Sequence, residues 1–443
     1  MSGIRLRLGV CALGLGLGGF ITTAGAVTQI PQPLTLNAAL DWAGDNNPTL
    51  RAAKIRVEQL TGKAIHADVA VPSNPRIELG AGQRSTTGGS GTDLNIQLSQ
   101  EFWVAGQGAL RESAANRELA AARDQYRYLV SATTARVRAA FLSVLVAEKA
   151  VTTARRVVKA NQALYDYAKR RMDAGAGTLL ELNAAQLGVS RATALLAQAK
   201  NRRQGARLAL DDLLGIDPRR TLAVAGKLSI DPLRLPDRAD LLERAARQRS
   251  DLVAAAGRVA AARERLKLAD RQIIPNLTVF GFYREENGGD GQGPLRRGLR
   301  RGATIAGGGV SFELPVLHRY AGERKQAAAA LDRAQLEREN LQRDVRLEVI
   351  GALSDYRSAR TQVEALNSAV FDAAQQSVEL TKRAFQAGEV GAPAITAAQN
   401  NLISVRAEYL SALEGLINAT TDLERATGGL IAVAADNAHT GAQ

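Results

Sequence analysis

The sequence predicts a mainly α-helical protein with a small β part, made of two similar halves and completed only as an oligomeric α/β-barrel. Three observations carry this prediction: stretches of about 65 residues with helical periodicity, pairs of short alternating segments, and a single repeat of that whole order. Hydrophobic residues make up 46% of the chain, but aromatic residues only 4%. Ala, Leu and Val carry the apolar content, and small side chains favour close packing of helix on helix.

Residues 1–26 are typical of a secretory signal peptide. Arg5 and Arg7 supply the charged start, Leu8–Phe20 is apolar, and Ala24-Gly25-Ala26 forms an A-x-A cleavage site. The apolar stretch is short for a membrane span, and no uninterrupted run of about 18 apolar residues follows it. The sequence therefore predicts an exported protein.

The single cysteine, Cys11, lies inside the predicted signal peptide. Val10 precedes it, where a lipidation motif requires Gly, Ala or Ser, so we expect cleavage; lipidation of Cys11 is the alternative. After cleavage the mature chain has no thiol, no disulfide and no cysteine metal site.

The formal net charge is +13. A basic balance is typical of proteins that meet nucleic acid or an anionic membrane. Export, and the lack of a nucleic-acid-binding motif in the sequence, argue against nucleic acid. Much of the charge is Arg scattered along helical segments, which is expected of helices that stand in water.

The chain repeats itself once, with a period near 213 residues. Ala174-Gly175 matches Ala387-Gly388, and the earlier segment 47–53 matches 249–255. A two-copy repeat of this length is a duplicated domain half, not a solenoid. The predicted divisions are a signal peptide at 1–26, a first repeat at 27–217, a linker at 218–236, a second repeat at 237–429 and a C-terminal tail at 430–443.

Each half has the same predicted order: a helix, two short strands, a very long helix and a return helix. Period-two alternation predicts the strands, as where Ile96 and Leu98 share one face and Asn95 and Gln97 the other. The first half is expected to run 35–71, Arg76–Gln83, Asp93–Phe102, 108–172 and 179–214. The second is expected to run 237–273, Asn276–Tyr283, Thr304–Leu314, 320–386 and 393–427.

The long helices carry apolar residues in steps of four and three, the pattern of a heptad seam. In the second half the predicted seam is Ala352, Tyr356, Ala359, Val363, Leu366, Val370, Ala373, Leu380 and Ala384. At about 1.5 Å per residue, a helix of this length is a rod of roughly 100 Å. Its surface is rich in Arg, Glu and Gln, so we expect the rod to stand in water.

The four alternating segments have the length of tilted transmembrane strands, about 8–11 residues. Bacterial barrels need at least about eight strands, and lipid does not tolerate open sheet edges. One chain therefore cannot close a membrane barrel, and two or more copies must share one. The alternative from the residues alone is a periplasmic coiled-coil scaffold with a small soluble sheet.

Three stretches, Leu34–Ala53, Leu98–Gln107 and Phe385–Gln399, carry a family resemblance that covers nearly all of the mature chain. The first resembles the opening "LTLxxAL…NPxLxAA" of the TolC-type outer membrane factor family, and the third resembles its "F-x-x-G" turn. The second is similar to the strand that enters the long helix in the cation-efflux (cobalt–zinc–cadmium) branch. In this order, within a duplication and behind a signal peptide, the three stretches are specific.

The resemblance implies a homotrimer with a twelve-stranded barrel in the outer membrane and a helical tunnel through the periplasm. It also implies docking to a periplasmic adaptor and to an inner-membrane resistance–nodulation–division pump or ABC exporter. The expected function is passive export of small solutes, such as metal cations or drugs. A role in type I protein secretion, the periplasmic scaffold and, least favoured, an enzyme are the alternatives.

Two Gly-bearing turns, Met172–Leu180 and Phe385–Ala392, are the candidate docking sites. By the resemblance they would lie at the periplasmic tip, where the tunnel narrows and the adaptor docks. Glycines that merely end helices give the same pattern. The candidate residues are Met172, Asp173, Gly175, Gly177, Phe385, Gly388, Glu389 and Gly391.

Three carboxylates, Asp173, Glu181 and Glu389, lie at or near these turns. Repeated around a pore mouth they would favour cations, although solvated charges at helix ends are the simpler interpretation. A separate basic loop, Arg284–Gly302, would lie outside the membrane near anionic lipid, or would simply be solvated. Its arginines of interest are Arg296, Arg297, Arg300 and Arg301.

No catalytic motif accompanies the three histidines, His66, His318 and His439. The sequence has no zincin, nucleophile-elbow, phosphate-loop or dinucleotide fingerprint in a suitable context. We therefore predict no catalytic, cofactor or metal-binding residues, and expect a partner to supply the energy for transport.

Overall fold

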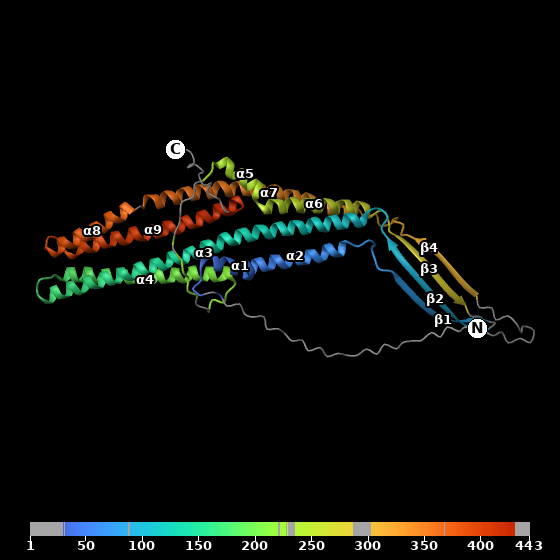
Figure 1. The fold of residues 1–443 in the computed structure, drawn as a ribbon, viewed down its shortest axis with the longest axis horizontal. Helices are drawn as coiled ribbons and strands as arrows, with labels where there is room; N and C mark the ends of the chain where they lie inside the picture. The colour runs from blue at the N-terminus through green and yellow to red at the C-terminus, as the bar shows by residue number, and fades with distance from the viewer. Residues whose placement is uncertain are drawn as a thin grey trace, which may run out of the picture.

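The structure is a computed structural model that describes residues 30, 32–86, 89–219, 222–226, 228, 235–286, 303–366 and 368–429. The predicted signal peptide, the C-terminal tail and His439 lie outside the described residues, as do Arg296, Arg297, Arg300 and Arg301. The molecule is elongated, with a sheet at one end and the turns of two helical hairpins at the other (Figure 1).

The predicted order of elements is confirmed in both halves. The first half comprises α1 (Leu36–Asn46), α2 (Pro48–Ala67), β1 (Arg76–Thr86), β2 (Gly89–Phe102), α3 (Gln107–Asp173) and α4 (Leu179–Leu214). The second comprises α5 (Arg238–Gln248), α6 (Ser250–Arg271), β3 (Leu277–Glu286), β4 (Ala303–Ser311), α7 (Ala321–Ala365), α8 (Ser368–Gln386) and α9 (Ala392–Thr427).

The first helix of each half is interrupted, which corrects the prediction of single helices over 35–71 and 237–273. Between α1 and α2, Asn47 adopts φ −59° and ψ 125° because Pro48 disfavours the helical conformation in the residue before it. Between α5 and α6, Arg249 is extended at φ −71° and ψ 108° although no proline follows. The second kink therefore depends on other contacts, described below.

The long helix predicted over 320–386 is also two helices, separated after Leu366. Leu366 leaves the helical region with φ −94° and ψ 50°, and the sequence there continues Asn367-Ser368, residue types that favour helix ends over interiors. The predicted seam holds as far as Val363. Beyond the break it shifts by one residue, so that the buried positions include Ala374 and Phe385 instead of Ala373, Leu380 and Ala384. Leu380 is 63% exposed.

The four strands form one antiparallel sheet in sequence order, β1-β2-β3-β4. Ile77 pairs with Leu98 and Leu79 with Ile96, and directly paired residues share a face. These four side chains are 38 to 74% exposed. The predicted division into an apolar and a polar face is therefore confirmed, and the apolar face is uncovered in the protomer.

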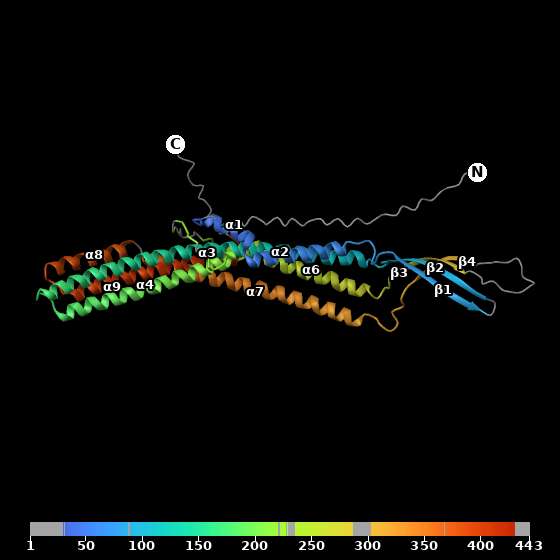
Figure 2. The same cartoon turned by 90° about the horizontal axis from the view of Figure 1, so that it is seen from below.

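Helix α3 is the centre of the helical body. It packs against α2, α4, α6 and α9, while α6 also contacts α7, and α9 contacts both α7 and α8. Helices α2, α6 and α7 lie between the middle of the molecule and the sheet, whereas α4, α8 and α9 extend toward the opposite end (Figure 2). The order from edge to edge beside the sheet is thus α2-α3-α6-α7.

One stretch of α3 is long and apolar enough, by length and composition, to cross a membrane. Half of that stretch is buried inside the protein, because α3 packs against α1, α2, α4, α6 and α9. Packing within the helical body accounts for its apolar character.

Candidate functional site

The first tip turn joins α3 to α4. Gly175 has φ 71°, a left-handed conformation that side chains disfavour. Its N–H donates to Met172 O at 2.9 Å, and the N–H of Ala176 donates to Arg171 O at 2.9 Å. These bonds satisfy the last carbonyl groups of α3 in a Schellman motif. Gly177 is required for space, because a Cβ there would lie 2.8 Å from Met172 N.

The second tip turn, between α8 and α9, repeats this geometry. Gly388 has φ 79°, its N–H donates to Phe385 O at 3.1 Å, and the N–H of Glu389 donates to Ala384 O at 2.9 Å. The predicted correspondence of Gly175 and Gly388 therefore extends to the backbone conformation.

The return helices begin differently at the two tips. Thr178 Oγ1 accepts from the N–H of Glu181 at 3.2 Å, and the N–H of Thr178 donates to Glu181 Oε2 at 3.4 Å, forming a capping box. Helix α9 begins after Gly391, which has no side chain for capping, and has Pro393 in its first turn. The first hairpin is thus better capped than the second.

The two tips pack against each other through a small apolar cluster. Phe385 is its centre, only 4% exposed, with Tyr167 edge-on at 5.4 Å and the Arg171 guanidinium 5.5 Å from its ring centroid. The rest of the cluster includes Leu164, Ala168, Ala185 and Ile395. Phe385 therefore holds the hairpins together and does not face solvent in the protomer.

The three candidate carboxylates are not equivalent. Asp173 and Glu389 are exposed at the tip surfaces. Glu181 is half-buried and caps α4, and it lies beside the second tip, since a Cβ on Gly391 would be 3.9 Å from Glu181 Oε1. Of the three candidates, one exposed carboxylate therefore comes from each hairpin.

Exposed apolar side chains at the first tip were missed by the sequence reasoning. Leu179 is 61% exposed and Leu180 71% exposed, and Met172, which was a candidate, is 38% exposed. The sequence did indicate this exposure, because Leu179 and Leu180 are adjacent in one helical turn and cannot both face the same partner helix. Together these residues form an apolar patch at the end of the first hairpin.

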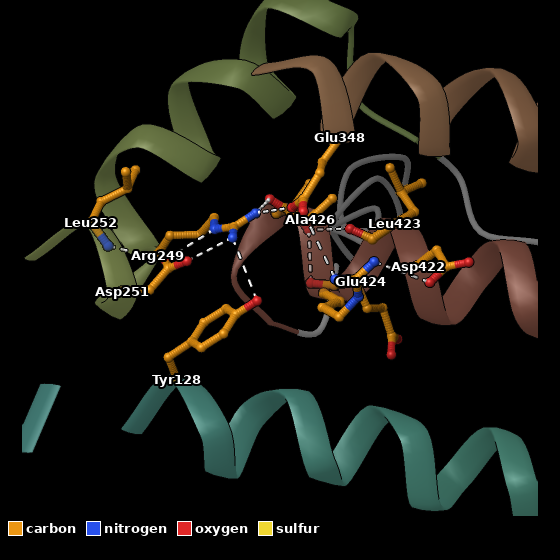
Figure 3. Close-up of polar contacts among 11 residues, drawn as sticks. Tyr128, Arg249, Asp251, Leu252, Glu348, Asp422, Leu423, Glu424 and Ala426 are labelled. Atoms are coloured by element: carbon orange, nitrogen blue, oxygen red, sulfur yellow. Dashed lines mark hydrogen bonds and ion pairs between the residues drawn. The ribbon is translucent and has the colours of Figure 1, made fainter. Parts of the chain in front are cut away.

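A second polar centre lies at the kink between α5 and α6, and its chemistry was not predicted. Arg249 is only 2% exposed. Its Nε and Nη2 donate to the two oxygens of Asp251 at 3.0 and 2.7 Å, and its Nη1 donates to Glu348 at 2.6 Å and to Ala426 O at 3.4 Å. The Tyr128 hydroxyl of α3 lies 3.5 Å from Nη2 (Figure 3). Arg249 therefore joins α3, α6, α7 and the end of α9.

The same junction contains a second buried pair. Arg138 of α3 donates to both oxygens of Glu424 of α9, at 3.1 and 2.8 Å. Burial raises the pKa of Glu424, an effect that Arg138 partly offsets. Burial alone would lower the pKa of Arg249, but hydrogen bonds to Asp251 and Glu348 outweigh it and raise that pKa above its usual range. Arg249 therefore stays charged.

The described residues contain no group of three or more His, Cys, Asp or Glu side chains that could hold a metal ion. His318 contacts Glu323 at 3.1 Å, and His66 lies 3.4 Å from Arg111, both at exposed positions.

A four-stranded sheet with an exposed apolar face, continued by helical hairpins with paired tips, defines a subunit of an oligomeric outer-membrane channel. The sequence profile of the family "outer membrane efflux protein" matches residues 39–216 and 241–429. The chain belongs to this family. It is a channel subunit of the outer membrane that extends into the periplasm, not an enzyme.

Known proteins with similar sequence or fold support this assignment. The chain is 28% identical over 407 residues to the cobalt-zinc-cadmium resistance protein CzcC of Cupriavidus metallidurans, covering 89% of this chain and 90% of that protein. The CmeC outer membrane channel of Campylobacter jejuni has the same fold, with a TM-score of 0.76 and 16% identity. The match covers 97% of this chain and 94% of that channel. A structure of CusC matches with a TM-score of 0.73 and 17% identity, and the match covers 89% of this chain and 92% of CusC.

Proposed function

We propose that three copies of this chain close one twelve-stranded barrel in the outer membrane and one helical tunnel beneath it. The observation that carries the proposal is the open sheet. Within the described residues, β1 and β4 each pair on one side only. Strand directions alternate, so β4 of one copy can pair antiparallel with β1 of the next, and lipid does not tolerate the alternative of an open edge. Helices α2 and α7 are at the corresponding ends of the helical row.

The hairpin tips are the docking site for a periplasmic adaptor, which connects the channel to an inner-membrane pump. The exposed patch of Met172, Leu179 and Leu180 supports this role, because a group of exposed apolar side chains is typical of a protein-binding surface. The resemblance stated above favours a pump of the resistance–nodulation–division type, and an ABC exporter is the alternative.

The cargo class that we propose is metal cations, on the basis of the relative named as a cobalt-zinc-cadmium resistance protein. The exposed carboxylates Asp173 and Glu389 would favour cations at the tunnel entrance. Transport is passive within the channel, and the pump supplies the energy.

Substitution at the tips tests the docking role. Gly175→Val and Gly388→Val force side chains into left-handed positions, but a Cβ at either site meets no atom within 4 Å. The turns should therefore distort without disrupting the hairpin cores. We expect trimers in the outer membrane but loss of efflux in cells that depend on this channel.

Gly205→Val is the matched control, since Gly205 is an exposed glycine of α4 with equal space around it. It should retain efflux. Normal efflux by both tip variants would contradict adaptor docking at the tips. Single-channel conductance by the purified trimer in a planar bilayer tests the channel itself, and a soluble, non-conducting monomer would refute it.

A further inference from the structure

Two phenylalanines interrupt the polar face of the sheet. Phe280 pairs with Ser99 and Phe282 with Gln97 across β2, so both rings lie on the face opposite to Ile96 and Leu98. Both are half-buried, and the rings stack with centroids 6.5 Å apart and planes 27° apart. Two aromatic side chains on a face that otherwise has mostly polar residues and glycines need an explanation.

The glycines of β4 determine how these rings lie. Phe280 pairs with Gly309 and Phe282 with Gly307. A Cβ on Gly309 would lie 2.9 Å from Phe280 Cζ, and one on Gly307 would lie 2.8 Å from Phe282 Cζ. The rings therefore occupy the space that side chains at these two positions would need. The Cζ end of each ring therefore lies over the backbone of β4.

In the proposed channel this face lines the aqueous lumen, because the apolar face must meet lipid. This step rests on the proposed function. Each copy contributes two rings, and three copies place them around one level of the barrel. That level lies near the middle of the strand, since Phe280 and Phe282 are the fourth and sixth of the ten residues of β3, which leaves the helical body at Leu277 (Figure 1).

The net charge of the polar face favours a cation over an anion. Glu78 pairs with Gln97, in the same row as Phe282, and Glu101 pairs with Thr278, one row below Phe280. The polar face of the described strands has four carboxylates and three guanidinium groups: Glu78, Asp93, Glu101 and Glu286 against Arg76, Arg84 and Arg284. Arg84 is engaged by Asp93 and Glu286. Nearest the rings, Glu78 and Glu101 are balanced by Arg76 and Arg284, so the excess is one carboxylate per copy over the whole face.

The chemistry of the aromatic rings indicates which class of cation would bind. An aromatic face attracts cations, most effectively those that shed water easily, such as quaternary organic ions. Aromatic groups on the ligand can also stack on the rings. We propose that Phe280 and Phe282, seated on Gly307 and Gly309, form an aromatic band in the lumen that binds ring-bearing organic cations in transit. This extends the proposed cargo beyond metal cations.

Block of single-channel current tests the band. Tetraphenylphosphonium, added to the full-length mature trimer in a planar bilayer, should block the current more strongly than tetrabutylammonium, which has no rings. In the double variant Phe280→Leu with Phe282→Leu, the apparent affinity for tetraphenylphosphonium should fall about 5- to 30-fold, as loss of two cation–π contacts predicts. Tyr283→Leu is the matched control, because Tyr283 is adjacent in sequence but pairs with Ile96 on the lipid face.

A second variant retains every ring. Gly307→Ala places a methyl group where the Phe282 ring lies, so the ring must move toward the lumen. We expect the open-channel conductance to fall and the block by tetraphenylphosphonium to change. Gly82→Ala on β1 meets no atom within 4 Å and should behave as the wild type. A conducting trimer without selective block, or equal loss of block in the Tyr283 variant, would overturn the aromatic band alone. A trimer that never conducts would overturn both this inference and the proposed channel.

Discussion

Asn47 and Arg249 occupy equivalent positions in the two halves and both form the kink of the first helix, but by different chemistry. Asn47 is 3% exposed; its side chain accepts from the N–H of Leu50 at 3.0 Å and donates to Leu213 O at 2.7 Å. Arg249 also donates to a carbonyl at the end of a return helix, Ala426 O, but it needs two carboxylates as partners.

The backbone around the two kinks is nevertheless the same. The return helices α4 and α9 end at Gly215 and Gly428, which have φ 65° and 88°. A Cβ on Gly215 would lie 2.6 Å from Asn46 O, and one on Gly428 would lie 3.1 Å from Arg249 N. The duplication has thus retained the close approach of kink and helix end, while the side chains diverged. In the first half, the neutral side chain of Asn47 bonds only to residues of the same half. In the second half, the charged side chain of Arg249 also contacts Tyr128 of α3, which belongs to the first half.

Among substitutions at the two kinks, removal of Arg249 should cause the largest loss in the free energy of unfolding. Arg249→Met leaves Asp251, whose side chain is 7% exposed, without its partner. Breaking a buried ion pair in this way costs about 3–5 kcal/mol. Denaturation of the helical body in detergent, followed by circular dichroism, should show this loss. Arg425→Met is the control: Arg425 also reaches Glu348, at 3.9 Å, but is 27% exposed, so little change in unfolding free energy is expected.

The two helix-end glycines should respond unequally to the same substitution. Gly215→Val combines a left-handed backbone with a clash against a main-chain oxygen, and should cost about 2–3 kcal/mol. Gly428→Val should cost less, because a Cβ there would lie 3.1 Å from its closest atoms, against 2.6 Å at Gly215. The difference in denaturation midpoint measures this. Equal losses would show that backbone strain, and not the closeness of the kink, sets the cost.

Removal of the neutral cap should have a smaller effect. Asn47→Ala loses the hydrogen bond to Leu50 N–H at the start of α2 and the bond to Leu213 O, for a loss of about 1–2 kcal/mol. Thr35→Ala, at the more exposed start of α1 where the cap bond is 3.4 Å, is the control. A loss at Asn47 as large as that at Arg249 would mean that the two kinks depend equally on their side chains.

The smallest effects concern two equivalent buried acids, Asp211 and Glu424. Burial raises the pKa of both, with partial offset by Arg207 and Arg138 respectively. A raised pKa means that the folded state holds the proton more tightly, so stability falls as pH rises from the unfolded pKa to the folded one. Relative to Asp211→Asn and Glu424→Gln, the wild type should therefore lose stability across that interval. If the difference in thermal midpoint between the wild type and these variants does not change with pH, the raised pKa values of Asp211 and Glu424 would be contradicted.

Local patterns were sufficient for much of the fold. Alternation predicted both faces of the sheet, and the repeat predicted that Gly175 and Gly388 are equivalent. What the sequence could not reveal depends on distant contacts: the partners of Arg249 at Glu348 and Ala426 lie 99 and 177 residues away. The break after Leu366 interrupts a continuous heptad pattern, and Phe385 was placed at the tip surface although packing against Tyr167 buries it.

The two unpaired edges of the sheet also determine how stability must be measured. A single copy cannot satisfy the backbone groups of β1 and β4 in lipid, so the membrane-inserted part has no stable monomeric form in the proposed assembly. Folding of the strands and association of the copies are then one equilibrium, and the apparent stability rises with protein concentration. Below the concentration at which copies meet, the helical body can still fold, and it would persist as a species whose strands have no membrane partner.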